Sequence, residues 1–484
     1  MSSHDELSRR HGARYKWLAT ATAMIGTFSM VVEATILNVA LPDIMAAFAV
    51  GQQTAQWLVT GFLAAMTAGM LLNAWCVERF GMRATYVGAI LVFCSASLLG
   101  ALAPSIGLLI LARVAQGAAA GVIQPLGMIV VFEVFAPQER GRGFGLYGLG
   151  VVLGPAIAPM IGGLLVDLVS WRAVFLVVLP TCVAAVPMAL MFLRSGKAAS
   201  PPPLDLAGLA LLSGTLAVSL WAMASGPRVG WDQPAVAGGL LIGLAGAVAF
   251  VAWEWFCPSP LLNLRAFRSG GFASGFLLSA MIGVGLYAST YLIPLYLQQV
   301  KHLEPSAAGL ILLPAGLAMA FTFPLAGRLT DRMPATVVAL IGILLFLGSC
   351  VMLARVDEAG GLLWFTVGIV VGRIGIGLMM PPVSAGTLRL LDLRMVPQGS
   401  GAINFGRQLG GAIGVGLISV VLSVGSGAHG PDFAGMGEAA RRAAQAEGYH
   451  IAFYALAASF AATLLPLWLM HRQTRRTHAV GGAS

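Results

Sequence analysis

The chain of 484 residues is 58% hydrophobic and only 10% charged, whereas soluble domains carry about 25% charged residues. A soluble fold of this composition would expose large apolar patches, so the composition excludes a soluble globular protein and indicates a membrane protein. The net charge of +9 is not a nucleic-acid footprint, because the basic residues gather at the ends of apolar runs. We therefore expect no nucleic-acid partner.

Fourteen apolar runs follow one another along the chain, each near the roughly 20 residues that an α-helix needs to cross a bilayer. They cover residues 17–41, 54–76, 84–103, 106–130, 143–166, 173–193, 205–224, 234–256, 272–296, 306–326, 335–354, 361–383, 400–424 and 450–470. The pattern predicts an all-α integral membrane protein with 14 transmembrane helices. An even number puts both termini on one side, and the excess of Lys and Arg there predicts that this side is the cytoplasm.

Glu33 is the one charged residue of the first run. An acid in the middle of a spanning helix costs about 2.5–3.5 kcal/mol on insertion scales, so it is by default a functional group. Burial disfavours the charged form of a carboxyl group, which makes it able to take up and release protons. The alternative is a structural acid that pairs with an Arg or a hydroxyl group on a neighbouring helix.

Arg113 lies within the fourth run. At 1.5 Å per residue, Glu33 and Arg113 lie about 13 Å and about 10 Å below the outer ends of their helices. The depths agree, so the two side chains can pair if the helices are neighbours. A proton and a cationic substrate would then compete for the carboxylate. The alternative is that Arg113 donates to backbone carbonyl groups and only stabilises the bundle.

An internal repeat indicates the architecture. Residues 74–83 and 327–334 each place a small residue four positions before an acid that Arg follows directly. A second echo is an Arg within a span followed by Gly four residues later, at Arg113 and Arg373. These echoes match if spans 1–6 and 9–14 are equivalent halves and spans 7 and 8 are an inserted hairpin. The predicted domains are a tail at 1–16, a half at 17–193, a linker with helices 7 and 8 at 194–256, a half at 257–470 and a tail at 471–484.

Several motifs give these halves a family resemblance. The loop from Ala74 to Arg83 resembles the Gly-x-Leu-x-Asp-Arg-x-Gly-Arg motif of the major facilitator superfamily, with Ala74 and Glu78 as departures. Glu33 stands at the Asp position of Asp-x-Thr-x-x-Asn-x-Ala-x-Pro in span one. Span five resembles the antiporter signature through Gly150, Gly154, Pro155, Pro159, Gly162 and Gly163. The chain is thus similar to the 14-helix drug:proton antiporter family (EmrB/QacA type), although Val178 stands where that family usually has Asn.

This resemblance implies a proton-coupled multidrug efflux transporter that exports amphipathic toxic compounds by alternating access. It implies a role in proton coupling for Arg113, a location in the bacterial inner membrane, and no cofactor beyond the proton gradient. The partners would be amphipathic small molecules, protons and the lipid bilayer. In Gram-negative relatives of this type, a periplasmic adaptor and an outer-membrane channel join them.

The remaining candidate residues fall into three groups. Aromatic, Met and polar side chains that could line a drug cavity, with plain packing as the alternative, are Phe28, Met30, Asn38, Trp57, Phe62, Met66 and Gln116. The predicted conformational latch consists of Glu78, Arg79, Gly81, Arg83, Asp331 and Arg332. The roles of Glu133, Arg373 and Arg407 stay open: a gate, relay or salt bridge for Glu133, a structural or substrate role for Arg373, and a snorkelling side chain for Arg407.

Two other functions remain as alternatives. The chain could be a dedicated carrier of one endogenous metabolite, either an exporter or an importer, or a transport-inactive receptor or scaffold. An enzyme is not expected, since no P-loop, nucleophile elbow or metal-ligand cluster occurs in the sequence. We predict neither catalytic nor metal-binding residues.

Overall fold

In the computed structural model of the protein, residues 7, 9–196, 202–356, 361–426 and 437–481 are described. Every regular element within these ranges is a helix. The helices are η1 Gly12–Arg14, α2 Tyr15–Phe48, α3 Gln52–Ala55, α4 Trp57–Phe80, α5 Met82–Ala101, α6 Ile106–Val134, α7 Arg140–Leu168, α8 Ala173–Leu176, α9 Leu179–Phe192, α10 Leu206–Val229, α11 Pro234–Phe256, η2 Leu264–Arg268, α12 Gly270–Gln299, α13 Pro305–Arg332, α14 Ala335–Ala354, α15 Leu362–Leu388, η3 Leu393–Met395, α16 Val396–Gly425, α17 Glu438–Ala461 and α18 Leu464–Gly481.

In the described ranges, 14 helical segments are long and apolar enough to cross a membrane, which confirms the predicted number. Helices are the expected answer to such runs, because a helix satisfies its own backbone hydrogen bonds where lipid offers none. Several spans combine consecutive helical elements. The second consists of α3 and α4, the sixth of α8 and α9, and the fourteenth passes from α17 into α18.

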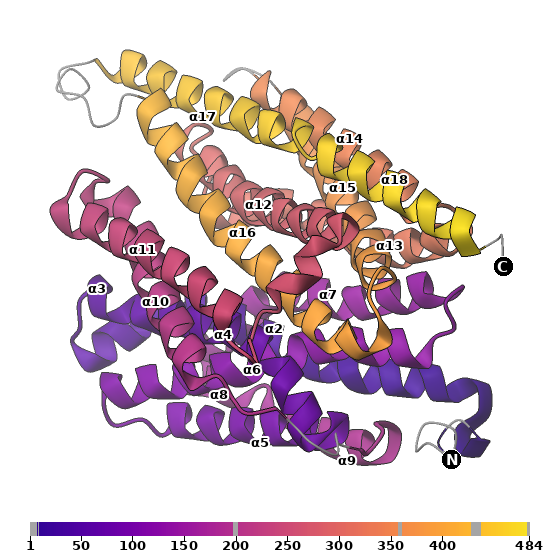
Figure 1. Ribbon diagram of the computed structural model, residues 1–484. Coiled ribbons are helices and arrows are strands. Elements are labelled where there is room, and N and C mark those ends of the chain that lie inside the picture. The colour runs from indigo at the N-terminus through magenta and orange to yellow at the C-terminus, as the bar shows by residue number, and fades with distance from the viewer. Residues whose placement is uncertain (1–6, 8, 197–201, 357–360, 427–436, 482–484) are drawn as a thin grey trace. The chain divides into compact units, whose positions relative to one another are not determined.

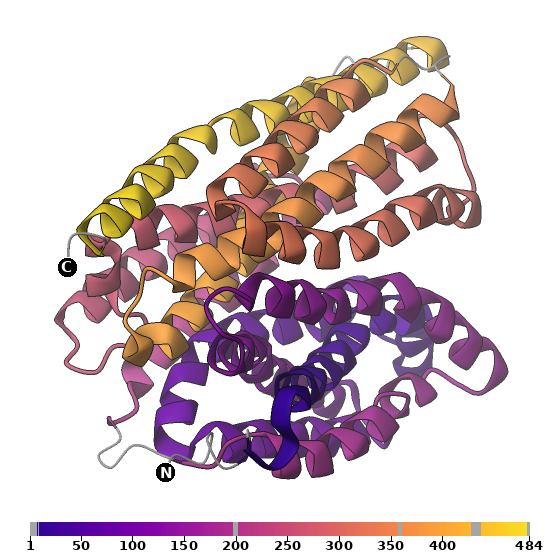
Figure 2. The same ribbon diagram turned by 90° about the vertical axis from the view of Figure 1, so that its right-hand side faces the viewer.

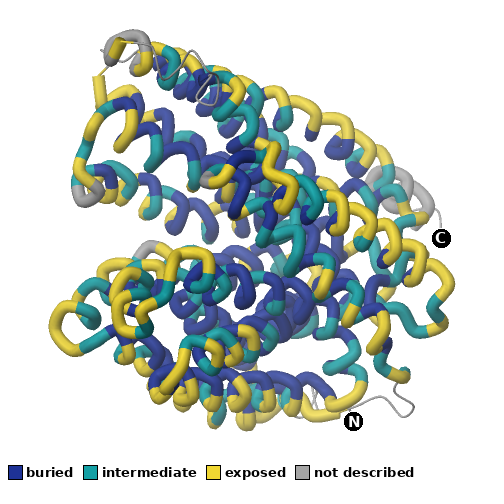
Figure 3. Tube along the Cα trace, turned by 90° about the vertical axis from the view of Figure 1, so that its left-hand side faces the viewer, coloured by how far each residue is buried: buried dark blue, intermediate teal, exposed yellow. Residues whose placement is uncertain are grey.

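The helices form two compact units. Unit 1 comprises Met1–Trp221, Gly239–Arg265 and Leu391–Phe405. In it α6 packs against α2, α4 and α5, and α2 also packs against α7 and α9. The buried faces of these helices, dark blue in Figure 3, turn inward, and the connecting loops are largely exposed.

Unit 2 comprises Ala222–Gly238, Ala266–Leu390 and Gly406–Ser484. In it α15 packs against α12, α13 and α14, and α14 also packs against α17 and α18. Figure 1 labels these helices, and Figure 2 shows the long orange and yellow helices of this unit running side by side.

The same pairs of helices are in contact in both units. The helix of the fourth span, α6, touches those of spans one, two and three, and the helix of the twelfth span, α15, touches those of spans nine, ten and eleven. This correspondence agrees with the sequence repeat, in which spans 1–6 match spans 9–14. The residue boundaries of the predicted domains stay predictions, and the two units divide α10, α11 and α16 between them.

Candidate functional site

Glu33 and Arg113 meet in the interior of unit 1. Glu33 lies near the middle of α2 and Arg113 in the second turn of α6. Their side chains are 0% and 1% exposed, and Arg113 Nη1 lies 3.3 Å from Glu33 Oε1. The two groups lie at the compatible depths expected from the sequence, and the contact between α2 and α6 brings them together.

The Arg113 guanidinium is held on several sides. Its Nε donates to the Leu58 carbonyl at 3.2 Å, and its Nη1 also donates to the Glu33 carbonyl at 3.5 Å. Its planar face lies over the Phe62 ring, with the carbon Cζ 4.2 Å from the ring centroid. Such a stacked cation gains further stabilisation when it is desolvated. Both roles that the sequence left open for Arg113, acid partner and donor to backbone carbonyls, are present in its geometry.

Gln116 completes the cluster. Its Oε1 accepts from Arg113 Nη1 at 3.0 Å, and its Nε2 donates to Glu33 Oε1 at 3.2 Å and to Ser97 Oγ at 2.8 Å. Gln116 is fully buried. It is thus a bridge within the ion pair, and its amide is oriented by both charged groups and by α5.

One oxygen of the cluster has no hydrogen-bond partner among the described residues. Glu33 Oε1 accepts from Arg113 and Gln116, whereas Glu33 Oε2 is buried and accepts no hydrogen bond from the described residues. A buried polar atom without a hydrogen bond is costly and requires an explanation. The free lone pairs of Oε2 are a place where a proton or a donor from another molecule can bind.

The other predicted cavity residues are distributed unevenly. Met30 and Phe62 are 2% and 1% exposed and Met66 is 8% exposed, so they pack inside unit 1. Phe28 and Trp57 are partly exposed, and Asn38 is exposed. Phe62 covers the Arg113 guanidinium. A drug-lining role for these residues stays a prediction.

The motif glycines of α7 make a groove for α2. Added Cβ atoms at Gly154 and Gly162 would meet Val31 at 3.0 Å and Ile36 at 2.8 Å, and one at Gly150 would overlap the Met24 side chain. These positions share one helical face because they are separated by multiples of four residues. Gly163 faces open space, and Pro155 and Pro159 are exposed. The helix that carries Glu33 therefore lies directly on the glycine face of α7.

The predicted latch loop of unit 1 is tied to the end of α9. Gly81 has φ +83°, and a Cβ there would overlap the Gly196 carbonyl, so a side chain is excluded twice. Arg83 Nε donates to the Leu193 carbonyl at 2.7 Å. Next to it, Arg194 forms a salt bridge of 2.9 Å with Glu133. Glu133 is thereby placed in a salt bridge, and the loop holds α4 and α5 to the end of the sixth span.

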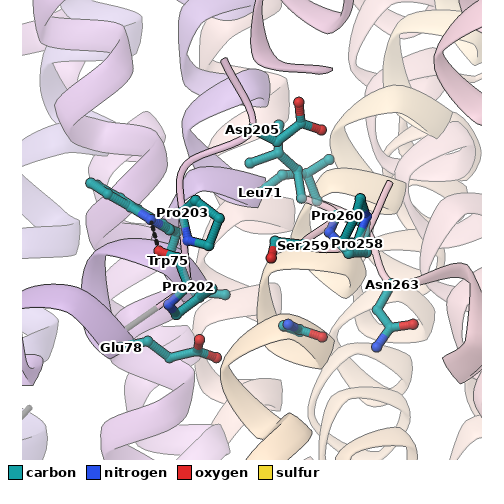
Figure 4. Close-up of a pocket in the computed structure, with 13 residues that line it drawn as sticks. Leu71, Trp75, Glu78, Pro202, Pro203, Asp205, Pro258, Ser259, Pro260 and Asn263 are labelled. Atoms are coloured by element: carbon teal, nitrogen blue, oxygen red, sulfur yellow. Dashed lines mark hydrogen bonds between the residues drawn. The ribbon is translucent and has the colours of Figure 1, made fainter. Parts of the chain in front are cut away.

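Glu78 lines a cavity of about 300 Å³ beside the segments at residues 202–205 and 258–263 (Figure 4). Trp75 Nε1 donates to the Pro202 carbonyl at 3.0 Å along this wall, and Asp205 shares the lining. No ion pair of Glu78 occurs among the described residues, and its neighbour Arg79 is exposed. The structure thus ties Gly81 and Arg83 directly to the end of α9, whereas Glu78 faces the chain after α9 only across this cavity.

The corresponding loop of unit 2 follows α13. Asp331 interacts electrostatically with Arg389, which directly follows α15, and burial lowers the pKa of Arg389 while Asp331 opposes that shift. Arg332 is exposed. In this unit the predicted latch acid therefore faces an arginine that the sequence motif did not indicate.

Comparison with known proteins identifies the family to which this architecture belongs. The family model described as Major Facilitator Superfamily matches residues 23–415. The chain belongs to the major facilitator superfamily. This result confirms the resemblance drawn from the motifs, and the protein is a transporter of that superfamily.

Several curated relatives of this transporter carry names from drug resistance. The multidrug resistance protein B homolog of Mycobacterium tuberculosis (strain ATCC 25618 / H37Rv) is 33% identical over 398 residues, which cover 81% of this chain and 73% of that protein. The lincomycin resistance protein LmrB of Listeria monocytogenes is 27% identical over 431 residues, which cover 89% of this chain and 90% of that protein.

Two solved structures share the fold. The human organic anion transporter MFSD10 (TETRAN) superposes with a TM-score of 0.65 at 15% identity and covers 94% of this chain and 99% of its own. The proton:xylose symporter XylE has a TM-score of 0.63 at 14% identity and covers 94% and 96%. At these identities the likeness concerns the fold alone.

Sequence reasoning missed two parts of the transporter's buried cluster. Ser97 and the Leu58 carbonyl both contact it, but a serine or a backbone carbonyl in an apolar span carries no signal of its own. Only the adjacency of α4, α5 and α6 identifies them. Gln116 was identifiable, because an amide within an apolar run requires buried partners.

Proposed function

We propose that the protein exports amphipathic toxic compounds from a bacterial cell in exchange for protons, by alternating access. The observation that carries the proposal is the buried Glu33 carboxylate with one oxygen bound by Arg113 and Gln116 and the other oxygen free. The names of the relatives support drugs as substrates, and the Lys and Arg distribution supports cytoplasmic termini in the inner membrane.

The charge of the cluster changes with one proton. With Glu33 ionised, the carboxylate and the Arg113 guanidinium neutralise each other. With Oε2 protonated, Arg113 leaves a net positive charge in a water-poor interior, where charges interact strongly. A cationic group of a substrate is accepted in the first state and repelled in the second, so a proton and a substrate exclude each other.

This exclusion drives exchange only if the two sides of the membrane select different states. A ligand shifts a conformational equilibrium by its difference in affinity between the conformations. We infer that the difference in ligand affinity between the conformations arises at α2, since this helix bears Glu33 and lies on the glycine face of α7. At these glycines α7 presents no side chain, so the side chains of α2 lie directly against the α7 backbone.

Proton-driven transport of ethidium into inverted membrane vesicles, where an exporter pumps toward the lumen, tests the proposal. Glu33→Gln keeps the shape of the side chain and removes its proton chemistry, so we expect proton-driven transport to disappear while the protein remains inserted. Glu139→Gln is the matched control, because Glu139 forms a partly exposed salt bridge with Lys16 outside the cluster; its transport should stay near that of the wild type.

Each other outcome has a defined meaning. Proton-driven efflux by Glu33→Gln would contradict the coupling role and reduce Glu33 to a structural acid. Absence of transport of any tested drug by the wild type would favour a carrier of a single metabolite or a transport-inactive receptor. An adaptor and an outer-membrane channel form no part of the proposal, because the loop that would meet them includes residues 427–436, outside the described ranges.

A further inference from the structure

Arg373 is a charged residue within a membrane-spanning helix of unit 2. It lies about 16 Å along α15 from Leu362, in a helix of 27 residues. A guanidinium at such a depth is costly unless it meets a partner, water or a ligand. The groups around the Arg373 guanidinium therefore indicate what this side chain binds.

The partners of Arg373 are few. Its Nη2 donates to Thr290 Oγ1 at 2.9 Å, and no carboxylate of the described residues pairs with it. A guanidinium carries five N–H donors, so most of them remain available. The side chain is also partly exposed. Arg113 of unit 1, by contrast, is 1% exposed and has its own carboxylate.

The repeat explains what is missing. Arg113 in span four meets Glu33 in span one, and Arg373 in span twelve meets Thr290 in span nine. The helices correspond, but a hydroxyl stands where unit 1 has an acid. As far as the structure describes unit 2, it thus retains the cation of the pair without its anion.

The neighbouring surface is polar as well. Tyr287 lies one helical turn before Thr290, is 37% exposed, and donates its hydroxyl to Gln408 Oε1 at 2.9 Å. Gly411 leaves room for the Tyr287 ring on α16. The Gln408 amide nitrogen is a further donor on this face. Exposed polar groups and an arginine at membrane depth face water or substrate, since lipid offers them no partners.

We propose that Arg373, with Thr290 as its hydrogen-bond partner, is an anion-binding subsite that receives a carboxylate of the transported compound. A guanidinium is suited to this task because its parallel N–H groups match the two oxygens of a carboxylate. The subsite predicts that acids and zwitterions are among the substrates, and this inference rests on the proposed transport of amphipathic compounds.

A matched pair of dyes tests the subsite: tetramethylrhodamine, which bears a free carboxylate, and its methyl ester. Binding to the purified transporter is measured by fluorescence anisotropy. We expect Arg373→Gln to weaken binding of the acid about tenfold, as the loss of a charge-assisted contact of about 1.4 kcal/mol requires, and to leave ester binding nearly unchanged. Arg373→Lys should retain part of the affinity for the acid.

Thr290→Glu is a second variant that keeps Arg373. It supplies the acid that unit 1 has at the corresponding helix, so we expect it to weaken binding of the acid dye and not of the ester. Thr290→Gln, similar in size and neutral, is its control and should retain the affinity for the acid. Monodispersity and thermal unfolding of each purified variant verify that it is folded.

Three results would overturn the subsite. The first is an equal loss of affinity for both dyes, and the second is an unchanged affinity for the acid dye in Arg373→Gln or in Thr290→Glu. The third is that the wild type does not bind the acid dye. The proposed function is judged separately by proton-driven efflux of the ester. If that efflux is absent while the acid binds in an Arg373-dependent manner, the exporter proposal fails and the subsite stands.

Discussion

Arg113 of unit 1 and Arg373 of unit 2 hold the same place in the sequence repeat, each four residues before a glycine, but their surroundings differ. Arg113 is enclosed by a carboxylate, an amide, a backbone carbonyl and an aromatic ring. Arg373 is partly exposed and donates to one hydroxyl. One motif can therefore supply an internal ion pair in one half and, in the other, a cation that no described acid neutralises.

The largest expected difference between the two units is the loss of stability when each arginine is replaced. Arg113→Gln leaves the Glu33 carboxylate buried without its cation, which costs about 3–5 kcal/mol. Arg373→Gln removes one hydrogen bond to a hydroxyl but also a costly cation that no described carboxylate neutralises, so we expect a loss of about 1 kcal/mol or less. Thermal unfolding of both variants in detergent measures the difference. Equal shifts would show that the two arginines are equally engaged.

Double-variant cycles sharpen this contrast. For Glu33→Gln with Arg113→Gln we expect a coupling of about 1–3 kcal/mol, because the two side chains are in direct contact. For Thr290→Val with Arg373→Gln we expect about 0.5 kcal/mol or less, since a neutral hydroxyl is the partner. The unfolding free energies of singles and doubles give both values, and comparable coupling in the two units would contradict the assignment.

The glycines that follow the arginines differ in their neighbours. An added Cβ at Gly117 would overlap the Phe62 backbone carbonyl, whereas one at Gly377 would lie 3.0 Å from the Thr322 side chain. We expect Gly117→Ala to cost about 1–3 kcal/mol, because backbone cannot yield without moving α4. Gly377→Ala should cost less, and thermal unfolding decides the order. A larger loss at Gly377 would reverse the comparison.

The smallest expected difference concerns two buried serines in corresponding helices. Ser97 in α5 accepts from Gln116 Nε2, and Ser349 in α14 donates to the Gly368 carbonyl. Ser97→Ala leaves a buried amide proton unpaired, at a cost of about 1 kcal/mol. Ser349→Ala should cost less, because the Gly368 carbonyl remains in the hydrogen-bond ladder of α15. A greater loss for Ser349→Ala would contradict this explanation.

The candidate site was partly accessible from the sequence. Glu33, Arg113 and Gln116 are conspicuous because charged and amide groups in apolar runs demand partners. The environment of Arg373 was not accessible, since Thr290 is unremarkable in a membrane helix and only the contact between α12 and α15 brings it to the arginine. The roles of Glu133 and Arg194 likewise depended on where α9 ends.

The sequence by itself determined the class, the number of spans and the repeat, because lipid requires about 20 apolar residues per helix and leaves the backbone no alternative to the helix. The motif residues also determined the family. Only the tertiary structure decided that Glu33 is paired through one oxygen, that Gln116 bridges the ion pair, and that Arg373 meets a hydroxyl and no described acid. These facts depend on contacts between helices far apart in the chain, and hydropathy carries no information about which faces meet.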